Sequence, residues 1–218
     1  MPLMRWRTRL QTPITQRSIK MKNYLCIDGK KIELTQEQLQ QLGVVKEPEV
    51  SLSTDGKIAK IGEYEFIVLN NDGEKVELLL KETLGEDTVF GDNNDFKTSK
   101  VKKILDKFAQ EIEKLVGADN LLDHTVDLMA LDGLKEYGTI KAKMSLLTVA
   151  QVWEHVDTLE EFKYDGWWWL ATPWSTPKHG YKETVTCVSP FGGINHDYCL
   201  YYYGVRPFCV LKSSIFQS

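Results

Sequence analysis

The stretch that decides the fold is strongly aromatic, opening at residues 164–173 as YDGWWWLATP and closing at residues 201–208 as YYYGVRPF. Fourteen of the chain's 23 aromatic residues lie from Phe162 onward. Aromatic side chains contribute large apolar surfaces to cores and to binding sites. This density therefore predicts a packed β core, a binding face, or both.

Three short segments of this region have the composition of strands: residues 167–172, 184–188 and 204–211. β-branched and aromatic residues favour strands, and the Gly, Pro and Ser between them favour turns. Pro207 has no N–H to donate to a ladder, so we expect it at an edge or a bulge.

Upstream, residues 61–69 and 76–80 predict a hairpin, and their unbroken apolar runs indicate that both of its faces are covered. Residues 101–116 repeat apolar side chains at the helical period, with Thr98 or Ser99 as the N-cap. We expect this helix to lie on the hairpin.

A second helix is predicted to begin after Thr148, with Val149, Val152, Trp153 and Val156 facing inward. The elements together predict an α+β fold with two helices and a largely antiparallel sheet.

The chain is predicted to have four parts. Residues 1–20 carry five basic side chains and no acid, which leaves 22 basic against 31 acidic side chains in the remainder. This basic extension is either an arm that binds a polyanion or translated sequence ahead of a true start at Met21. Residues 21–45 predict a small ββα module, 46–60 a linker, and 61–218 the main domain.

Charge and hydropathy exclude two classes of partner. A folded part with a net charge near −9 binds nucleic acid poorly, because phosphate contact relies on clustered Lys and Arg. No window approaches the roughly 18 apolar residues that a membrane-spanning helix needs, and the N-terminus lacks the apolar centre of a secretory signal. We expect a protein that is cytoplasmic in its producing cell, or part of a phage particle.

The cysteines offer one hypothetical metal site. Cys187, Cys199 and Cys209 fall close to His196, yet none forms the closely spaced pair that is typical of zinc sites. Burial as small apolar side chains explains them better.

Other clusters of polar residues are weaker candidates for a metal or catalytic site. Residues 91–95 are rich in side-chain oxygen but do not follow the calcium-loop spacing. Asp123, His124 and Asp127 resemble metal ligands only in composition. The sequence also lacks a nucleophile elbow, a zinc-protease helix and a phosphate loop. We therefore expect no metal, no cofactor, no catalytic residue and no enzymatic activity.

The predicted binding face lies in two C-terminal loops that combine Tyr with Asn, Asp and His. Tyrosine gives a large amphipathic contact area at low entropic cost, and the other residues supply adaptable hydrogen bonds, as in antibody loops. If the chain continued in strict alternation, either Tyr201 and Tyr203 or Tyr202 would be buried. The candidate ligand-binding residues are Trp174, His179, Tyr181, Asn195, His196, Asp197, Tyr198, Tyr201, Tyr202 and Tyr203.

Arg206 and Trp168 are expected to be structural. The guanidinium could bind a ligand carboxylate or pair with a buried acid such as Asp165. The position of Arg206 in the closing strand favours the structural pairing.

Three motifs in order carry a resemblance: WWLATP at 168–173, VTCVSPFG at 185–192 and YYGVRP at 202–207. The set resembles a family of unknown function in Gram-positive bacteria and their phages, over about residues 61–211. Its C-terminal part resembles the C-type lectin fold of formylglycine-generating enzymes and phage tropism determinants. The resemblance implies a C-type-lectin-like domain that recognises a surface protein or a glycan.

The resemblance leaves several roles open. Residues 195–203 resemble the variable regions of retroelement-diversified lectin-fold proteins. One alternative is a structural subunit of a phage particle, which could be a homo-oligomer. Another is an enzyme like the formylglycine-generating relatives, although no cysteine pair here has the required spacing. The tripeptides of calcium-dependent sugar binding are absent from the sequence, which disfavours that mode.

Overall fold

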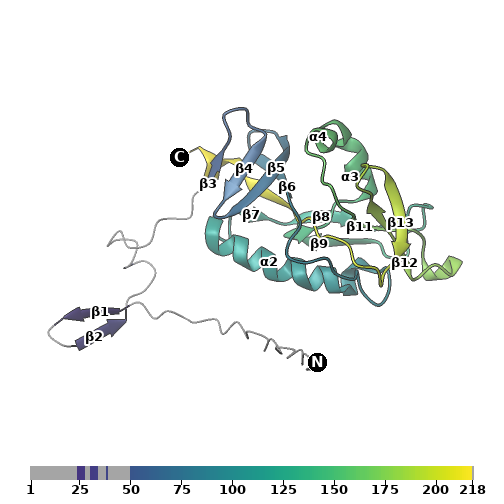
Figure 1. Cartoon of the computed structure of the whole chain (residues 1–218), viewed down its shortest axis with the longest axis horizontal. Coiled ribbons are helices and arrows are strands. Elements are labelled where there is room, and N and C mark those ends of the chain that lie inside the picture. Colours follow the sequence, from purple (N-terminus) through teal and green to yellow (C-terminus); the bar gives the residue numbers. More distant parts are fainter. Residues whose placement is uncertain (1–23, 28–29, 34–37, 39–49, 218) are drawn as a thin grey trace, which may run out of the picture. The chain divides into compact units, whose positions relative to one another are not determined.

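The computed structural model describes residues 24–27, 30–33, 38 and 50–217, and the chain divides into two compact units, Met1–Glu47 and Pro48–Ser218 (Figure 1). In the first unit, β1 (Tyr24–Ile27) pairs antiparallel with β2 (Lys30–Glu33), in agreement with the two strands of the ββα module predicted at residues 21–45. The basic extension at 1–20 lies outside the described residues, as does most of the helix predicted before residue 45.

The second unit is built on an antiparallel sheet of seven strands. Its main path runs β10-β14-β6-β5-β4-β3, and β7 also pairs with β14. The final strand of the chain therefore lies between strands formed much earlier in the sequence. The bounds are β3 Val50–Leu52, β4 Ile58–Ile61, β5 Tyr64–Asn71, β6 Lys75–Leu80, β7 Leu121–Leu122, β10 Met144–Ser145 and β14 Phe208–Lys212.

The structure corrects two predictions made from the sequence. The segment 46–60 was expected to be a linker, but β3 and most of β4 lie in it, and β4 buries Ala59 and Ile61 in alternation with partly exposed residues. The alternation of β4 covers only four residues and is surrounded by polar residues, so the sequence did not indicate a strand there. The strand predicted at 61–69 is also interrupted. Gly62 adopts a φ of 60° and forms the turn that connects β4 to β5.

The central hairpin is buried on both faces, as predicted. On β5, Phe66 belongs to one apolar cluster and Ile67 to another, and on β6 Leu78 and Leu79 divide in the same way. Successive strand residues point to opposite faces, so the sheet separates the two clusters.

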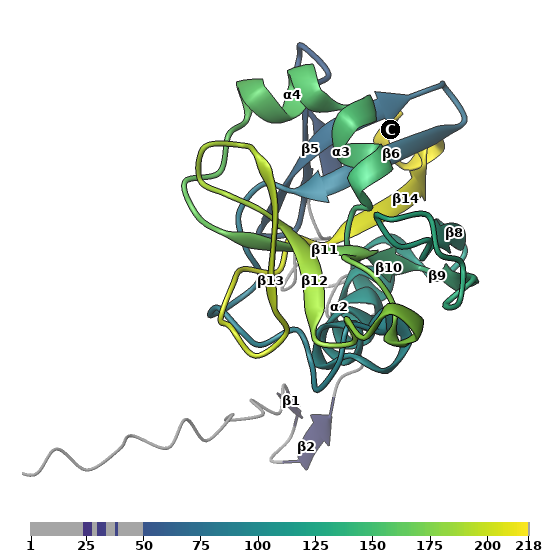
Figure 2. The same cartoon turned by 90° about the vertical axis from the view of Figure 1, so that its right-hand side faces the viewer.

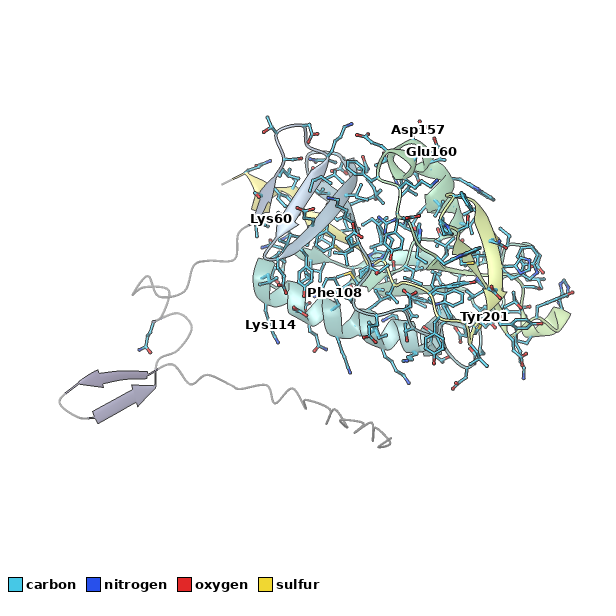
Figure 3. All side chains as sticks on the ribbon, viewed as in Figure 1. Lys60, Phe108, Lys114, Asp157, Glu160 and Tyr201 are labelled. Atoms are coloured by element: carbon cyan, nitrogen blue, oxygen red, sulfur yellow. The ribbon has the colours of Figure 1, made fainter. Side chains whose placement is uncertain are left out.

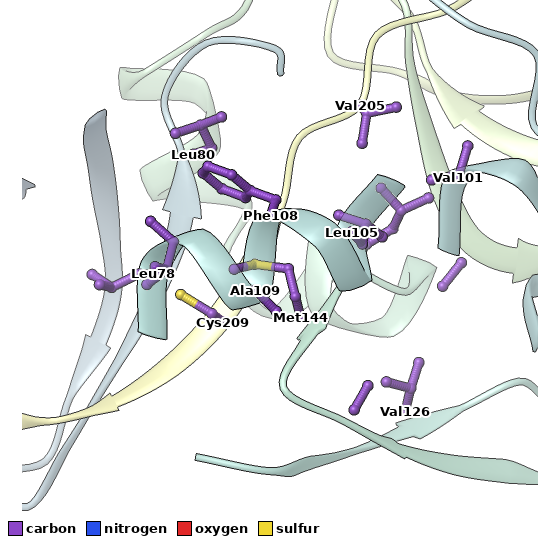
Figure 4. Packing of buried hydrophobic residues seen from close by; sticks show 14 of the residues in the cluster. Leu78, Leu80, Val101, Leu105, Phe108, Ala109, Val126, Met144, Val205 and Cys209 are labelled. Carbon is purple, nitrogen blue, oxygen red and sulfur yellow. The ribbon is translucent and has the colours of Figure 1, made fainter. Parts of the chain in front are cut away.

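Helix α2 (Lys100–Val116) covers one face of the sheet, as predicted (Figure 4). Ser99 caps it by accepting a hydrogen bond from the backbone N–H of Lys102, and Gly117 ends it. Its buried stripe includes Leu105 and Phe108, which join the cluster that contains Leu80.

The second predicted helix is divided into α3 (Val149–Glu154) and α4 (Val156–Glu161). Thr148 forms the expected N-cap, and Val152 is buried. The inward placement of Trp153 and Val156 was wrong, because they are 61% and 44% exposed. The helical register is interrupted at His155, so residues beyond it no longer continue the stripe.

A smaller antiparallel sheet has the order β11-β12-β13, from Trp168–Pro173, Thr184–Val188 and Ile194–Tyr198 (Figure 2). Pro207 lies just before β14, so the last strand is shorter than predicted. The remaining elements are the pair β8 (His124–Asp127) and β9 (Thr139–Ala142), and the 3-10 turns Phe96–Thr98, Pro177–His179 and Ser213–Phe216. The α+β class with mostly antiparallel strands is confirmed. No helix in the described part of the chain is long and apolar enough to cross a membrane.

Candidate functional site

Five of the ten predicted ligand-binding residues line one open cavity of about 390 Å³. This cavity, called the aromatic groove below, lies where the loop after β11 meets the strands β12 and β13. Its lining residues are Trp174, Gly180, Tyr181, Glu183, Thr184, His196, Asp197 and Tyr198.

Strand pairing explains how residues distant in sequence meet in the groove. Thr184 faces Tyr198 across the β12–β13 ladder, and Thr186 faces His196. Trp174 follows β11 directly, and its ring lies 3.8 Å from the His196 ring, centroid to centroid. Tyr181 and Tyr198 are 53% and 59% exposed, so both can reach a ligand.

The tyrosine run after β13 has a mixed role that simple alternation did not predict. Tyr203 is half-buried, stacks on Trp167 with ring centroids 5.2 Å apart, and donates its hydroxyl to Asp197 at 2.6 Å. Burial, with Asp197 beside it, raises the pKa of the Tyr203 hydroxyl. Tyr201 and Tyr202 are both exposed, because a turn follows β13. Figure 3 labels Tyr201.

His179 and Asn195, like the three tyrosines at 201–203, lie outside the groove lining. His179 is exposed, and its Nδ1 lies 3.1 Å from an Asp132 carboxylate oxygen that also accepts the Ser175 hydroxyl. The hydrogen bond from Ser175 is the main cause that lowers the pKa of Asp132. Asn195 is exposed on β13 and accepts from the backbone N–H of His196.

Asn94 is the positioning residue that the sequence did not reveal. It is fully buried, and its amide nitrogen lies 2.9, 2.8 and 2.7 Å from the carbonyl oxygens of Ser175, Tyr181 and Thr184, so its two N–H donors are shared among three acceptors. Its amide oxygen accepts the Tyr137 hydroxyl at 2.6 Å. One side chain in the oxygen-rich segment 91–95 thus holds both ends of the loop that forms the aromatic groove.

Arg206 is buried and hydrogen-bonded within the fold, but its partners are not the acid expected from the sequence. The side chain is 1% exposed, and Nε and Nη2 donate to the carbonyls of Leu80 and Lys81 at 3.1 and 2.9 Å. Asp165 is exposed, so it cannot be the buried partner. The guanidinium instead lies 5.5 and 5.0 Å from the ring centroids of Tyr164 and Trp168.

Arg206 and Trp168 also line a second cavity, of about 220 Å³, beside α3 and α4. It shares no lining residue with the aromatic groove.

Cys187, Cys199, Cys209 and His124 are buried side chains whose charged forms are disfavoured. Burial raises the pKa of Cys187, Cys199 and Cys209 to about 12, which keeps them as thiols. His124 places Nε2 2.8 Å from the Ser145 hydroxyl, and burial lowers its pKa to about 4. Within residues 24–27, 30–33, 38 and 50–217, no three His, Cys, Asp or Glu side chains are grouped to hold a metal ion.

Comparison with known proteins identifies one similarity. A family model described as a domain of unknown function (DUF6273) matches residues 126–213. The match runs from within β8 to just beyond β14 and includes every residue that lines the aromatic groove or the second cavity. The chain has no match among curated proteins or among solved structures.

Proposed function

We propose that the chain is a non-enzymatic recognition module that binds a glycan or protein ligand through the aromatic groove. The observation that carries the proposal is the convergence of Trp174, Tyr181, His196 and Tyr198 on one open cavity. Ligand sites typically combine aromatic walls with a few polar groups that fix orientation.

The polar groups favour a glycan as the first ligand to test. Glu183 and Asp197 line the groove, and carboxylates accept hydrogen bonds from hydroxyl donors. Exposed aromatic faces beside such acceptors suit a polyhydroxylated ring, which has both apolar C–H faces and hydroxyl edges. A protein ligand rich in hydroxyl or amide donors is the second candidate.

The proposal extends to the fold type and the origin of the protein. We propose that the main unit has a C-type-lectin-like fold and derives from a phage or prophage, as the motifs at 168–173, 185–192 and 202–207 suggest. Fold alone does not determine activity, so the argument for recognition rests on the groove.

The test is a binding screen of the full chain against a glycan array and intact Gram-positive cells. The variant pair Tyr181→Ala and Tyr198→Ala removes two exposed groove side chains, and Tyr202→Ala is the matched control because Tyr202 is 65% exposed but lies outside the groove lining. We expect each groove variant to weaken binding about tenfold or more, with unchanged unfolding midpoints. Equal binding by all three variants would refute the groove as the site.

A further inference from the structure

The cavity that contains Arg206 has an unusual combination of walls. Val152 and Leu159, from α3 and α4, line one side, and Trp168 of β11 lines another. Arg206, which is 1% exposed, is also a lining residue of this cavity. A cavity with apolar side chains on two of its sides therefore has a buried cation in its lining.

The positive charge of Arg206 is not neutralised by an adjacent acid. Across the described residues, its hydrogen bonds go to two neutral carbonyl groups, and no carboxylate lies within ion-pair distance of it. Burial lowers its pKa to about 10, and Glu82 opposes this only through a longer-range attraction. The guanidinium remains charged at neutral pH, and a guanidinium has five N–H donors, of which the carbonyls use two. A buried cation with donors to spare favours an anionic partner.

The other charged residues that line the cavity limit the charge of that partner. Lys163 and Glu160 both line it, and the Lys163 ammonium lies 5.6 Å from the centroid of the Phe191 ring. Glu160 lies on α4 (Figure 3). The one acid and the one base among the other lining residues balance each other, so Arg206 supplies the net charge of the site. This balance suits a single negative charge and disfavours a polyanion such as a nucleotide.

We propose that this cavity binds a small monocarboxylic acid with an apolar body, whose carboxylate pairs with Arg206 and whose body packs against Val152, Leu159 and Trp168. The planar fork of an arginine matches the two oxygens of a carboxylate. An apolar cavity of about 150 Å³ accepts benzene, so 220 Å³ accommodates an aromatic or branched aliphatic ring with a short acid chain. The site is separate from the aromatic groove, and its test does not depend on ligand binding there.

The experiment uses three probes that separate charge from shape. Binding of 3-phenylpropionate to the full chain is measured by calorimetry and ligand-observed NMR, beside 3-phenyl-1-propanol, which lacks the charge, and propionate, which lacks the ring. We expect 3-phenylpropionate to bind at least tenfold more tightly than either control. Equal binding of the acid and the alcohol, or no binding of the acid at millimolar concentration, would overturn the proposal.

Two variants locate the binding site. Arg206→Met is expected to abolish binding of the acid, but the loss of two buried hydrogen bonds could also unfold the protein. Val156→Trp provides the second test, because Val156 lines the cavity and is 44% exposed, so a larger side chain can block the entrance while the fold is kept.

Leu200→Trp is the matched control, since Leu200 is 66% exposed and lies outside the lining. We expect Val156→Trp to weaken the binding of 3-phenylpropionate at least tenfold and Leu200→Trp to leave its affinity unchanged. Unchanged binding by a folded Val156→Trp protein would show that the acid binds elsewhere and would overturn the assignment.

Discussion

Replacing Asn94 should destabilise the fold in a way that depends on the chemistry of the replacement. The two N–H donors of the Asn94 amide are shared among three carbonyl groups, and the neighbouring oxygen accepts from Tyr137. Removing the donor leaves the buried Ser175 carbonyl without this hydrogen bond, whereas Thr184 keeps a second donor in the backbone N–H of Trp174 at 3.2 Å. An unsatisfied buried polar group costs about 1–3 kcal/mol. With one to two carbonyls affected, Asn94→Ala should cost about 2–4 kcal/mol.

The isosteric Asn94→Asp variant should be worse than Asn94→Ala at neutral pH. It places a carboxylate oxygen where three carbonyl oxygens converge, and a buried unpaired charge costs about 3–5 kcal/mol. Burial and the carbonyls would raise the folded pKa of this carboxyl above its unfolded value of about 3.9. The penalty is then full above the folded pKa, shrinks as the pH falls through it, and loses its ionic part below about 3.9.

Urea unfolding at pH 7 and pH 5, followed by tryptophan fluorescence, measures both variants. Asn195→Asp is the control, because Asn195 is an exposed residue on β13, and its effect should stay within about 0.5 kcal/mol. We expect Asn94→Asp to recover stability relative to wild type at pH 5, and the Asn94→Ala deficit to be the same at both values. If Asn94→Asp is more stable than Asn94→Ala at pH 7, the amide orientation and the reasoning from it are wrong.

Three further predictions concern stability alone and are checked by the same unfolding measurements. Thr148→Ala should cost about 1 kcal/mol, because it removes the capping box with Gln151, and adding Gln151→Ala should cost less in that background than alone. Gly204→Ala would place a Cβ 2.2 Å from Thr83 Cγ2, so it should cost at least about 1–3 kcal/mol, and Thr83→Ala should restore part of the loss. Burial lowers the pKa of His124 in the folded protein to about 4, below its usual 6.5. The unfolded protein therefore takes up a proton at a higher pH than the folded protein, and the free energy of unfolding should decrease as the pH is lowered from 6.5 to 4. His124→Gln should remove up to about 3 kcal/mol of that pH dependence, and an unchanged profile would count against its burial as a neutral imidazole.

Elements specified by local sequence were predicted well. The stripe of α2 and the cap at Ser99 follow from side-chain spacing within one helix, and β12 was predicted with its observed bounds of 184–188. The two-sided burial of the β5–β6 hairpin also followed from its unbroken apolar runs. Such patterns are readable because the residues that determine them are close in sequence.

The features that depend on distant contacts were missed. Arg206 bonds to carbonyls at residues 80 and 81, and Asn94 bonds to carbonyls more than 80 residues away. A backbone carbonyl has no side-chain identity, so no residue pattern identifies it as a partner. The break between α3 and α4 was also not predictable from the sequence. It occurs at His155, which is neither a proline nor a glycine, the residues that usually indicate the end of a helix.

The smaller sheet explains how one short domain can hold two separate cavities. Trp168 and Val188 pair at one end of the β11–β12 ladder and both line the Arg206 cavity. Trp174 and Thr184 lie at the other end and line the aromatic groove. The five residues of β12 thus separate the two cavities by about 13 Å, at 3.3 Å per residue. Side chains this far apart, with no shared partner, usually act additively. A ligand in either cavity should therefore leave the affinity of the other unchanged unless it moves the strand that joins them.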